Sequence, residues 1–384
     1  MYTRSLRAPN RSFFLFGPRG TGKTTWLLQH FKEAKFIDLL PPQQALAYEK
    51  NPSLLRAQVK ALPKMQWIVI DEIQKVPILL DEIHFLMERE GYKKFILTGS
   101  SARKIKRGQA NLLAGRAVLL KMLPLTSTEI NFSLEPQTAL SYGMLPLSVL
   151  SKSVSEKESF LKAYVDTYLR EEIKYEGIVR NLGSFSRFLE IASLCAGQQI
   201  NMSNLARDAE ISRDTVRSYF SVFEDTLLGS WLPAYRPRAK VKEVAAPKFY
   251  WFDSGVLNAT AGAFEQPMPA DWNGILMEHW IHHELVGHMT YGHKKGSLGF
   301  WKTPNGNEID FLWWYGNEFI AIEVKSSKKF KKEFLKGIHS FQEKKQLKSS
   351  WVVYLGEEEL RIDQTHVVPA PQFLKLLSEG KIIP

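Results

Sequence analysis

Cysteine is almost absent from this sequence. Cys195 is the only one in 384 residues, so no disulfide can form within the chain, and we expect the protein to work in a reducing compartment, the cytoplasm. Long apolar runs are lacking too. None approaches the roughly 18 residues that a membrane-spanning helix needs, so we expect no membrane contact. The first 17 residues have basic side chains and a short apolar run but no small-residue cleavage site, which argues against a signal peptide.

Acidic residues are too few to balance the basic ones. The chain has 51 lysines and arginines against 40 aspartates and glutamates, a formal net charge of +11. Such an excess favours polyanionic partners, and DNA is the expected one. A charged surface that only keeps the protein soluble would give the same count, so charge alone leaves the partner open. The length exceeds that of one ordinary core and predicts two or three domains.

Four short apolar runs in the first 130 residues predict a largely parallel sheet with covering helices. Each run is bounded by Gly, Pro or charge, and helix-like segments lie between them. The runs are Phe13–Phe16, Phe36–Leu39, Trp67–Ile70 and Phe95–Leu97. We therefore predict an α/β domain over residues 1–130, a connection over 131–160, a helical region over 161–240 and a mixed α/β domain over 241–384.

One segment fits the phosphate-binding pattern G-x-x-x-x-G-K-[ST], with an apolar strand before it and a helix-like run after it. Its glycines let backbone N–H groups surround phosphates, and the helix presents its positive end to the same anion. Lys23 is expected to reach the β- and γ-phosphates, and the Thr24 hydroxyl is expected to bind Mg²⁺. A glycine-rich turn without a ligand is the alternative. The candidate nucleotide-binding residues are Gly17, Pro18, Arg19, Gly20, Thr21, Gly22, Lys23, Thr24 and Thr25.

The next two apolar strands end in polar residues that suit the same reaction. We expect Asp71 to hold Mg²⁺, directly or through water, and Glu72 to polarise the attacking water as general base. After the strand that follows, Ser100 is the first choice and Thr98 the second for a hydroxyl between that water and the γ-phosphate. Arg116 is a candidate for the guanidinium that stabilises charge on the γ-phosphate, often from a neighbouring subunit. Each assignment has an alternative. Asp71 and Glu72 could mark an ordinary strand end, Ser100 and Thr98 could lie in a solvated turn, and Arg116 could be a surface arginine.

Several segments together resemble one family. They are GPRGTGKTT, VIDEIQKVP, ILTGSSA, LLAGRAVLLKMLPLTSTEI, YGMLP, YVDTYLREEI, the helix pair near 204–224, PKFYWFDSGVLNA, and EIDFLW followed by IEVKSS. They look like the bacterial and archaeal AAA-type ATPases that carry a conserved C-terminal domain of unassigned function. The resemblance implies an AAA-type core that uses ATP and Mg²⁺, a winged helix within 161–240 and a nuclease-like fold within 241–384. AAA relatives commonly form rings or clusters, so the resemblance also implies a homo-oligomer.

Residues 201–228 follow the plan of a helix-turn-helix. One amphipathic helix and a short turn precede a second helix that Ser212 or Asp214 can cap. The predicted inward residues of the second helix are Val216, Tyr219, Phe220 and Phe223. Arg213 and Arg217 lie four residues apart on its outward face, so this helix is a candidate to enter the major groove of DNA. A helix pair used only for packing or subunit contact is the alternative.

Residues 307–325 predict a β-hairpin that brings charged residues together. A Gly-Asn pair between the two strands favours a two-residue turn, and counting outward from it places Asp310 opposite Glu323. Lys325 then falls on the same face. Two facing carboxylates repel each other, and a divalent metal would offset their charge.

The pattern Asp-x(n)-Glu-x-Lys resembles that of the restriction-endonuclease-like superfamily. Glu278, on an upstream helix, matches the extra acid of many nucleases in it. The resemblance implies a second divalent metal held by Glu278, Asp310 and Glu323, with Lys325 steadying the attacking water or the developing phosphate charge. An ion-pair network in an inactive relative of this fold is the alternative.

Four histidines lie close to Glu278 in the sequence. His279 and His283 are four residues apart, so one helix face could hold a metal. The zinc-protease spacing is not met, because Gly287 stands where the second histidine would be needed. A solvated position or one at the edge of the core is therefore the preferred interpretation for His279, His282, His283 and His288.

Two functions remain open at this point. In the first, ATP turnover drives a DNA-processing enzyme that cuts through Asp310, Glu323 and Lys325. In the second, the ATPase is a nucleotide-dependent switch that binds DNA or a protein and cuts nothing.

Overall fold

The computed structural model describes residues 2–92, 94–100, 115–169, 182–236 and 246–384. These residues fall into two compact units. The N-terminal unit is Leu6–Leu123 with Ser221–Leu228, and the C-terminal unit is Met1–Ser5, Pro124–Phe220 and Gly229–Pro384. No described helix is both long and apolar enough to cross a membrane.

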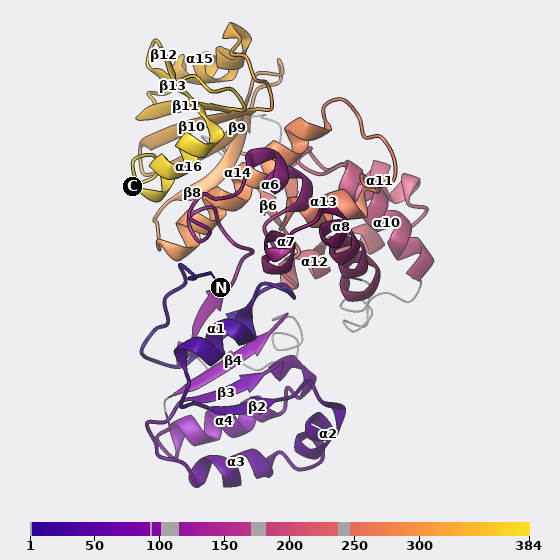
Figure 1. The fold of residues 1–384 in the computed structure, drawn as a ribbon, viewed down its shortest axis with the longest axis vertical. Coiled ribbons are helices and arrows are strands. Elements are labelled where there is room, and N and C mark those ends of the chain that lie inside the picture. Colours follow the sequence, from indigo (N-terminus) through magenta and orange to yellow (C-terminus); the bar gives the residue numbers. More distant parts are fainter. Residues whose placement is uncertain (1, 93, 101–114, 170–181, 237–245) are drawn as a thin grey trace. The chain divides into compact units, whose positions relative to one another are not determined.

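The N-terminal unit contains the predicted parallel sheet (Figure 1). Its strands are β1 (Phe13–Phe16), β2 (Lys35–Asp38), β3 (Ile68–Asp71), β4 (Phe95–Gly99) and β5 (Val118–Lys121). Their order is β2-β3-β4-β1-β5, and all neighbours are parallel. The first four correspond to the four apolar runs. The fifth was not predicted, because β5 is an edge strand with mixed burial and lacks a continuous apolar run.

Helices cover both faces of this sheet. On one face, α2 (Pro42–Lys50), α3 (Ser53–Lys60) and α4 (Leu79–Glu88) pack with the strands into one buried apolar cluster. On the other face lies α1 (Lys23–His30), whose Trp26 meets Phe13 of β1 edge to face at a ring distance of 6.4 Å. A sheet buried on both faces needs strands that are apolar throughout, which is why the sequence shows continuous runs instead of alternation.

The strand order brings three chain segments to one edge of the sheet. Since β4 lies between β1 and β3, the carboxyl ends of these three strands are neighbours. The glycine loop follows β1, Asp71 ends β3, and Thr98 lies in β4, whose Gly99 is level with Phe16. In open parallel sheets this edge is where ligands bind.

The first part of the C-terminal unit is mostly helical, including the residues predicted as a connection. Its helices are α6 (Pro136–Tyr142), α7 (Pro146–Leu150), α8 (Val154–Ala163), the π-helix η3 (Tyr164–Leu169), α10 (Leu182–Leu194), α11 (Met202–Asp208), α12 (Arg213–Asp225) and α13 (Ser254–Thr260). From Ser221 onward, α12 is counted with the N-terminal unit. Two short antiparallel strands follow α12: β6 (Gly229–Leu232) and β7 (Lys248–Trp251).

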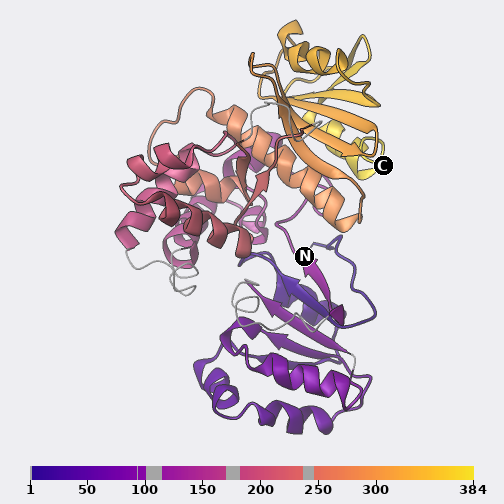
Figure 2. The same cartoon turned by 180° about the vertical axis from the view of Figure 1, so that it is seen from behind.

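The second part of the C-terminal unit is a mixed six-stranded sheet of order β12-β13-β11-β10-β9-β8 (Figure 2). Its strands are β8 (Ser297–Lys302), β9 (Glu308–Tyr315), β10 (Glu318–Lys325), β11 (Ser349–Tyr354), β12 (Leu360–Ile362) and β13 (Thr365–Pro369). The helices of this part are α14 (Trp272–Tyr291), the 3₁₀ turn η4 (Lys332–Leu335), α15 (Lys336–Gln342) and α16 (Ala370–Ser378). The predicted hairpin is confirmed: β9 and β10 are antiparallel, with Glu318 opposite Tyr315. Together the two sheets confirm the predicted α/β class.

Candidate functional site

The loop after β1 has the backbone geometry of a phosphate cradle. Gly20 and Gly22 have φ angles of 77° and 89°, which other residues rarely adopt. A Cβ atom at Gly17 would lie 2.3 Å from the carbonyl oxygen of Met122, so only glycine fits there. The Lys23 Nζ donates hydrogen bonds to the carbonyl oxygens of Gly17 at 2.7 Å and Pro18 at 3.1 Å. The ammonium group therefore lies within the loop, and α1 begins at Lys23 itself.

Other loop residues border this cradle. Thr21 is buried and its hydroxyl donates to the carbonyl oxygen of Pro18 at 2.9 Å, which holds the turn together. Arg19 is partly buried, while Thr24 and Thr25 are exposed at the start of α1. The two threonines are thus open to solvent.

Asp71 joins the loop to the two central strands. Thr24 Oγ1 donates to Asp71 Oδ2 at 2.8 Å, across 47 residues of sequence. The other oxygen of the carboxylate, Oδ1, accepts a hydrogen bond from the Thr98 hydroxyl. Asp71 and Thr98 are both buried, so this arrangement is fixed by the core beneath it. The Thr24 hydroxyl and the Asp71 carboxylate thus lie side by side. Both offer oxygen atoms, the ligands that Mg²⁺ prefers.

Glu72 is held by a residue that sequence reasoning missed. Its backbone is in the left-handed region, with φ 61°, which is uncommon for a residue other than glycine. Gln74 Nε2 donates to Glu72 Oε2 at 2.6 Å and to Ser100 Oγ at 3.2 Å. Gln74 thereby connects the candidate general base to the first-choice hydroxyl, Ser100. The sequence points only weakly to Gln74, because a glutamine two residues after an acidic pair belongs to no motif.

Arg116 lies at the opposite edge of the sheet from the glycine loop. It precedes β5, whose first residue, Val118, is level with Phe13 at the amino end of β1. Its Nε atom forms an ion pair with Glu88, the last residue of α4. Since the loop follows the carboxyl end of β1, Arg116 and the loop of the same chain are separated by the length of the strands.

A second cluster of charged side chains occupies the C-terminal unit. Asp310 of β9 and Glu323 of β10 both pair with Lys325 of β10. Lys325 Nζ lies 2.7 Å from Glu323 Oε1 and 3.4 Å from Asp310 Oδ2. Asp310 Oδ2 also accepts a hydrogen bond from the Val324 backbone N–H at 2.8 Å. Asp310 and Glu323 are each only 6% exposed. We call this group, with the residues described next, the carboxylate–lysine centre.

Lys248 links the predicted helix acid to this centre. Lys248 Nζ lies 3.5 Å from Glu278 Oε2 and 2.6 Å from Glu308 Oε1, while Lys302 takes the other oxygen of Glu308 at 2.6 Å. The Tyr250 hydroxyl donates to Glu278 Oε2 at 2.9 Å. Sequence reasoning did not single out Lys248, Tyr250 or Glu308. In the sequence, Lys248 could have been noticed as the first residue of an otherwise aromatic strand, Lys248–Trp251. The structure shows this strand buried throughout.

The pKa values in this centre are shifted by burial and by neighbouring charges. Burial raises the pKa of Glu323 above its ordinary value, and the negative charge of Asp310 raises it further. Burial also raises the pKa of Glu278. For Lys248, burial lowers the pKa, but the carboxylates of Glu278, Asp310 and Glu308 outweigh it, so the net pKa is raised and the ammonium stays charged.

The centre suits a metal only in part. One oxygen of Glu323, Oε2, is buried without a hydrogen-bond partner in the described part of the chain, as an unused ligand atom would be. The other carboxylates already have cationic partners in Lys248, Lys302 and Lys325. Across the described residues, no three His, Cys, Asp or Glu side chains are grouped so that they could hold a metal ion. Of the predicted metal set, Asp310 and Glu323 are joined through Lys325, while Glu278 pairs with Lys248.

The histidines of α14 are buried and contact different partners. His279 Nδ1 lies 2.7 Å from the carbonyl oxygen of Ile275, and His283 Nε2 lies 2.9 Å from that of Leu125. The His282 ring stacks on Tyr250 at 4.3 Å. Burial lowers the pKa of His279 and His283 to about 4 and that of His282 to about 3, so all three are neutral at pH 7. These three residues belong to the core.

The helix pair has the geometry predicted for it. Ser212 Oγ accepts from the Thr215 backbone N–H at 3.1 Å and so caps α12. Arg213 and Arg217 are exposed on α12. The strands β6 and β7 follow as a hairpin, and Gln199, before α11, forms an isolated antiparallel bridge with Lys248. The predicted inward residues of α12 are all buried: Val216, Tyr219, Phe220 and Phe223.

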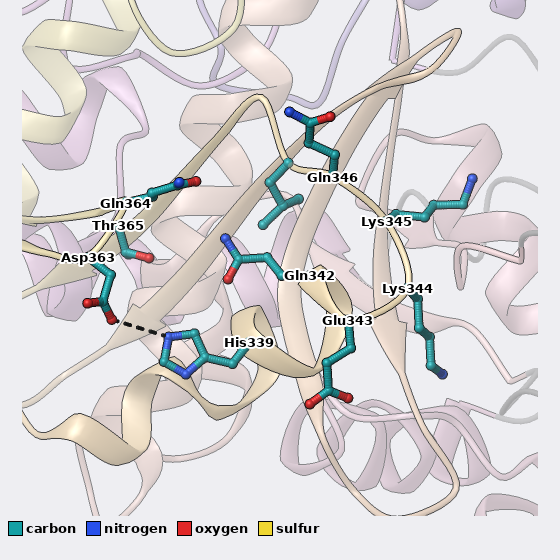
Figure 3. Close-up of a pocket in the computed structure, with 10 residues that line it drawn as sticks. His339, Gln342, Glu343, Lys344, Lys345, Gln346, Asp363, Gln364 and Thr365 are labelled. Atoms are coloured by element: carbon teal, nitrogen blue, oxygen red, sulfur yellow. Dashed lines mark ion pairs between the residues drawn. The ribbon is translucent and has the colours of Figure 1, made fainter.

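A polar hollow of about 650 Å³ lies beside α15 (Figure 3). His339 and Asp363 lie next to each other in its lining, with Nε2 and Oδ2 3.9 Å apart, while Lys344 and Lys345 point away from it. The hollow contains no predicted site residue. Its lining residues are His339, Gln342, Glu343, Lys344, Lys345, Gln346, Leu347, Asp363, Gln364 and Thr365.

Family models match three consecutive parts of the chain. Residues 9–131 match an AAA domain. Residues 135–267 match a domain of unknown function (DUF8612), and residues 273–373 match another domain of unknown function (DUF4143).

Relatives that match most of the chain occur in bacteria and archaea. The uncharacterized protein Rv2008c of Mycobacterium tuberculosis is 25% identical over 393 residues, which cover 99% of this chain and 85% of that protein. The uncharacterized protein MJ1544 of Methanocaldococcus jannaschii is 24% identical over 334 residues, covering 79% of this chain and 72% of that protein. The likeness therefore extends beyond the nucleotide loop to most of the chain.

Two solved structures are distantly similar. The replication initiator DnaA bound to AMPPCP and single-stranded DNA covers 56% of this chain and 83% of its own, with 16% identity and a TM-score of 0.29. Protein VC1899 from Vibrio cholerae covers 97% of both chains, with 10% identity and a TM-score of 0.22. At these TM-scores neither likeness bears on function. The glycine loop, the parallel sheet and the family matches together identify residues 9–131 as an AAA-type P-loop domain, followed in the chain by a domain of unknown function (DUF4143) at residues 273–373.

Proposed function

We propose that this protein hydrolyses ATP with Mg²⁺ and couples the turnover to binding of DNA. The observation that carries the proposal is the contact of Thr24 Oγ1 with Asp71 Oδ2 at 2.8 Å beside a lysine seated in the glycine loop. Residues far apart in sequence meet there at the carboxyl edge of a parallel sheet, and they are the residue types that triphosphate hydrolysis requires.

Each residue of this edge has a distinct task in the proposed reaction. Lys23 releases its two loop carbonyls and places its ammonium on the β- and γ-phosphates. Thr24 and Asp71 hold Mg²⁺, which neutralises phosphate charge when bound. Glu72 accepts the proton of the attacking water, and its hydrogen bond from Gln74 orients the carboxylate. The Ser100 hydroxyl, on the same glutamine, is placed to contact that water.

The proposed ATPase is tested by single-turnover and steady-state phosphate release. Lys23→Ala is expected to lose nucleotide binding, and Glu72→Gln to bind ATP but to lower turnover by about 10²-fold or more, as the removal of a general base does. Full phosphate release by Glu72→Gln would remove Glu72 from this role. Failure of the wild-type protein to bind or hydrolyse any nucleoside triphosphate would refute the proposal as a whole.

DNA is the proposed partner because of the second helix of the helix pair. Arg213 and Arg217 stand exposed on α12, and its inner face is filled by aromatic packing, so its outer face is free to enter a groove. In this proposal the antiparallel pair of β6 and β7 after α12 serves as the wing of a winged helix. A double Arg213→Glu, Arg217→Glu variant is expected to lose DNA binding and any DNA stimulation of ATPase activity while keeping basal ATPase. Unchanged DNA affinity in this variant would assign the helix pair to packing.

Metal-dependent DNA cleavage at the carboxylate–lysine centre is the second candidate function. The unpartnered oxygen of Glu323 beside Asp310 and Lys325 favours it. Against it stand the lysines that already neutralise the acids. The protein is incubated with DNA and Mg²⁺ or Mn²⁺: cleavage lost in Glu323→Ala but kept in Lys23→Ala supports a nuclease. Intact DNA under either metal, with DNA-stimulated ATPase, supports a nucleotide-dependent switch.

A further inference from the structure

A lysine-rich segment follows directly after the carboxylate–lysine centre. Residues 328–336, which we call the basic segment, hold five lysines and one glutamate. The five lysines, all exposed, are Lys328, Lys329, Lys331, Lys332 and Lys336. Only Lys331 has an ion-pair partner, Glu333, at 3.6 Å. The ammonium groups of the other four have no hydrogen-bond or ion-pair partner in the described part of the chain, so their charge faces solvent.

Both ends of the basic segment are anchored beside the centre. It begins three residues after Lys325, which limits the Cα separation to about 10 Å. Its far end returns to β9: a Cβ atom at Gly337, the residue after Lys336, would lie 1.8 Å from the carbonyl oxygen of Glu308. Glu308 is itself a member of the centre through Lys248. The unpartnered lysines thus border the buried acids instead of lying on an unrelated surface.

The apolar side chains of the basic segment all point into the protein. Phe334 and Leu335 are buried in the apolar cluster formed by α15 and the sheet, and Phe330 packs against the same cluster. Phe330 and Phe334 meet edge to face at 6.0 Å. The backbone is therefore held in place, while no apolar group is left outside to enter a lipid layer or an apolar protein groove.

We propose that the basic segment is a contact surface for the phosphate backbone of DNA, which it positions alongside the carboxylate–lysine centre. Unpaired ammonium groups on flexible stems suit phosphates as point charges and do not read bases. Each phosphate neutralised releases condensed counterions, so these contacts give affinity without sequence preference. The inference rests on the proposed DNA binding, and it adds a second contact region to the helix pair.

The test is the salt dependence of binding to a fluorescent DNA duplex of mixed sequence, measured by anisotropy on the full-length protein. The test variant carries Lys328→Ala, Lys329→Ala, Lys332→Ala and Lys336→Ala. A control variant loses the same charge from four other exposed lysines, Lys50, Lys152, Lys295 and Lys375. All eight side chains are exposed, so neither variant removes packing.

The two variants are expected to differ in the slope of log K against log salt. Each lost phosphate contact reduces the slope by about 0.9, so loss of the four lysines reduces it by about 2 to 4 and weakens binding at least about 10-fold at moderate salt. The control variant is expected to stay within about one unit of the wild-type slope. Basal ATPase is expected to be unchanged in both.

Three outcomes overturn the inference, and they are distinguishable from one another. If the wild-type protein binds DNA and the test variant matches the control, the basic segment is not a DNA contact, while the proposed function stands. If the wild-type protein binds no DNA at low salt, the proposed DNA coupling falls and the inference falls with it. If the test variant loses binding to anionic phospholipid vesicles but keeps DNA binding, the segment is a membrane contact.

Discussion

Replacing Lys248 by methionine removes one cation from a buried group of acids and keeps most of the side-chain volume. The ammonium lies 2.6 Å from Glu308 and 3.5 Å from Glu278 and is almost fully buried. Breaking a buried ion pair by removing one partner costs about 3–5 kcal/mol, because the remaining charge is left without compensation. Glu308 keeps Lys302, so the uncompensated carboxylate in the variant is Glu278. We therefore expect Lys248→Met to destabilise the C-terminal unit by about 3 kcal/mol.

Lys302→Met is the matched control. Lys302 Nζ lies at the same 2.6 Å from the other oxygen of Glu308, but its side chain is 29% exposed. Partly exposed pairs contribute about 1 kcal/mol or less. A third variant, Lys248→Met with Glu278→Gln, removes the uncompensated charge and keeps an acceptor for Tyr250, so it is expected to recover part of the lost stability.

The assay must report on the C-terminal unit alone, since a chain of two units need not unfold in one step. Hydrogen–deuterium exchange of peptides from β9 and β10 provides this, together with urea unfolding of the whole protein. Protection of these peptides is expected to fall by about two powers of ten in Lys248→Met and to change little in Lys302→Met. Equal effects of the two substitutions, or no gain from Glu278→Gln, would refute the view that Lys248 balances the buried acids.

Three further predictions concern other parts of the molecule. Asp253→Asn is expected to cost about 2 kcal/mol at pH 7.5, seen as a lower urea midpoint, because the Asp253 carboxylate accepts from the backbone N–H of Met144, between α6 and α7, and from that of Val256 in the first turn of α13; an unchanged midpoint would contradict this. His282→Phe is expected to lose less stability than the wild type as the pH falls below about 6.5. The pKa of His282 is lowered to about 3 by burial, so only the unfolded wild-type chain takes up that proton, at up to about 1.4 kcal/mol per pH unit; parallel pH profiles would speak against it. Arg116→Ala is expected to leave the affinity for a fluorescent ATP analogue within about twofold, because Arg116 pairs with Glu88 at the far edge of the sheet; a large loss of affinity would place the guanidinium at the nucleotide.

Much of the nucleotide edge could be read from the sequence because its signals are local. The glycine loop is recognised from eight consecutive residues, and Asp71 from the apolar strand that it ends. The same holds for the hairpin that joins Asp310 to Glu323, since a two-residue turn sets the register of both its strands. In each case the residues that matter are neighbours in the chain or are connected by a short turn of known geometry.

Other contacts have no local signal. Nothing near Thr98 in the sequence says that its hydroxyl reaches Asp71, because that contact depends on β4 lying beside β3. Gln74 was overlooked for a similar reason, as its partner Ser100 follows a different strand. Arg116 was chosen for its residue type, but its position before the amino end of β5 follows only from the direction of that strand.

The sequence by itself determined the class of the fold, the phosphate loop and the pairing of the hairpin, since each follows from the chemistry of adjacent residues. Only the tertiary structure decided which charges share a buried space. Lys248 comes from β7, Glu278 from α14 and Glu308 from β9, and they meet because packing of these three elements brings their side chains into one low-dielectric region. In such a region every carboxylate needs a cation close by, and which cation supplies it depends on the packing of the whole unit.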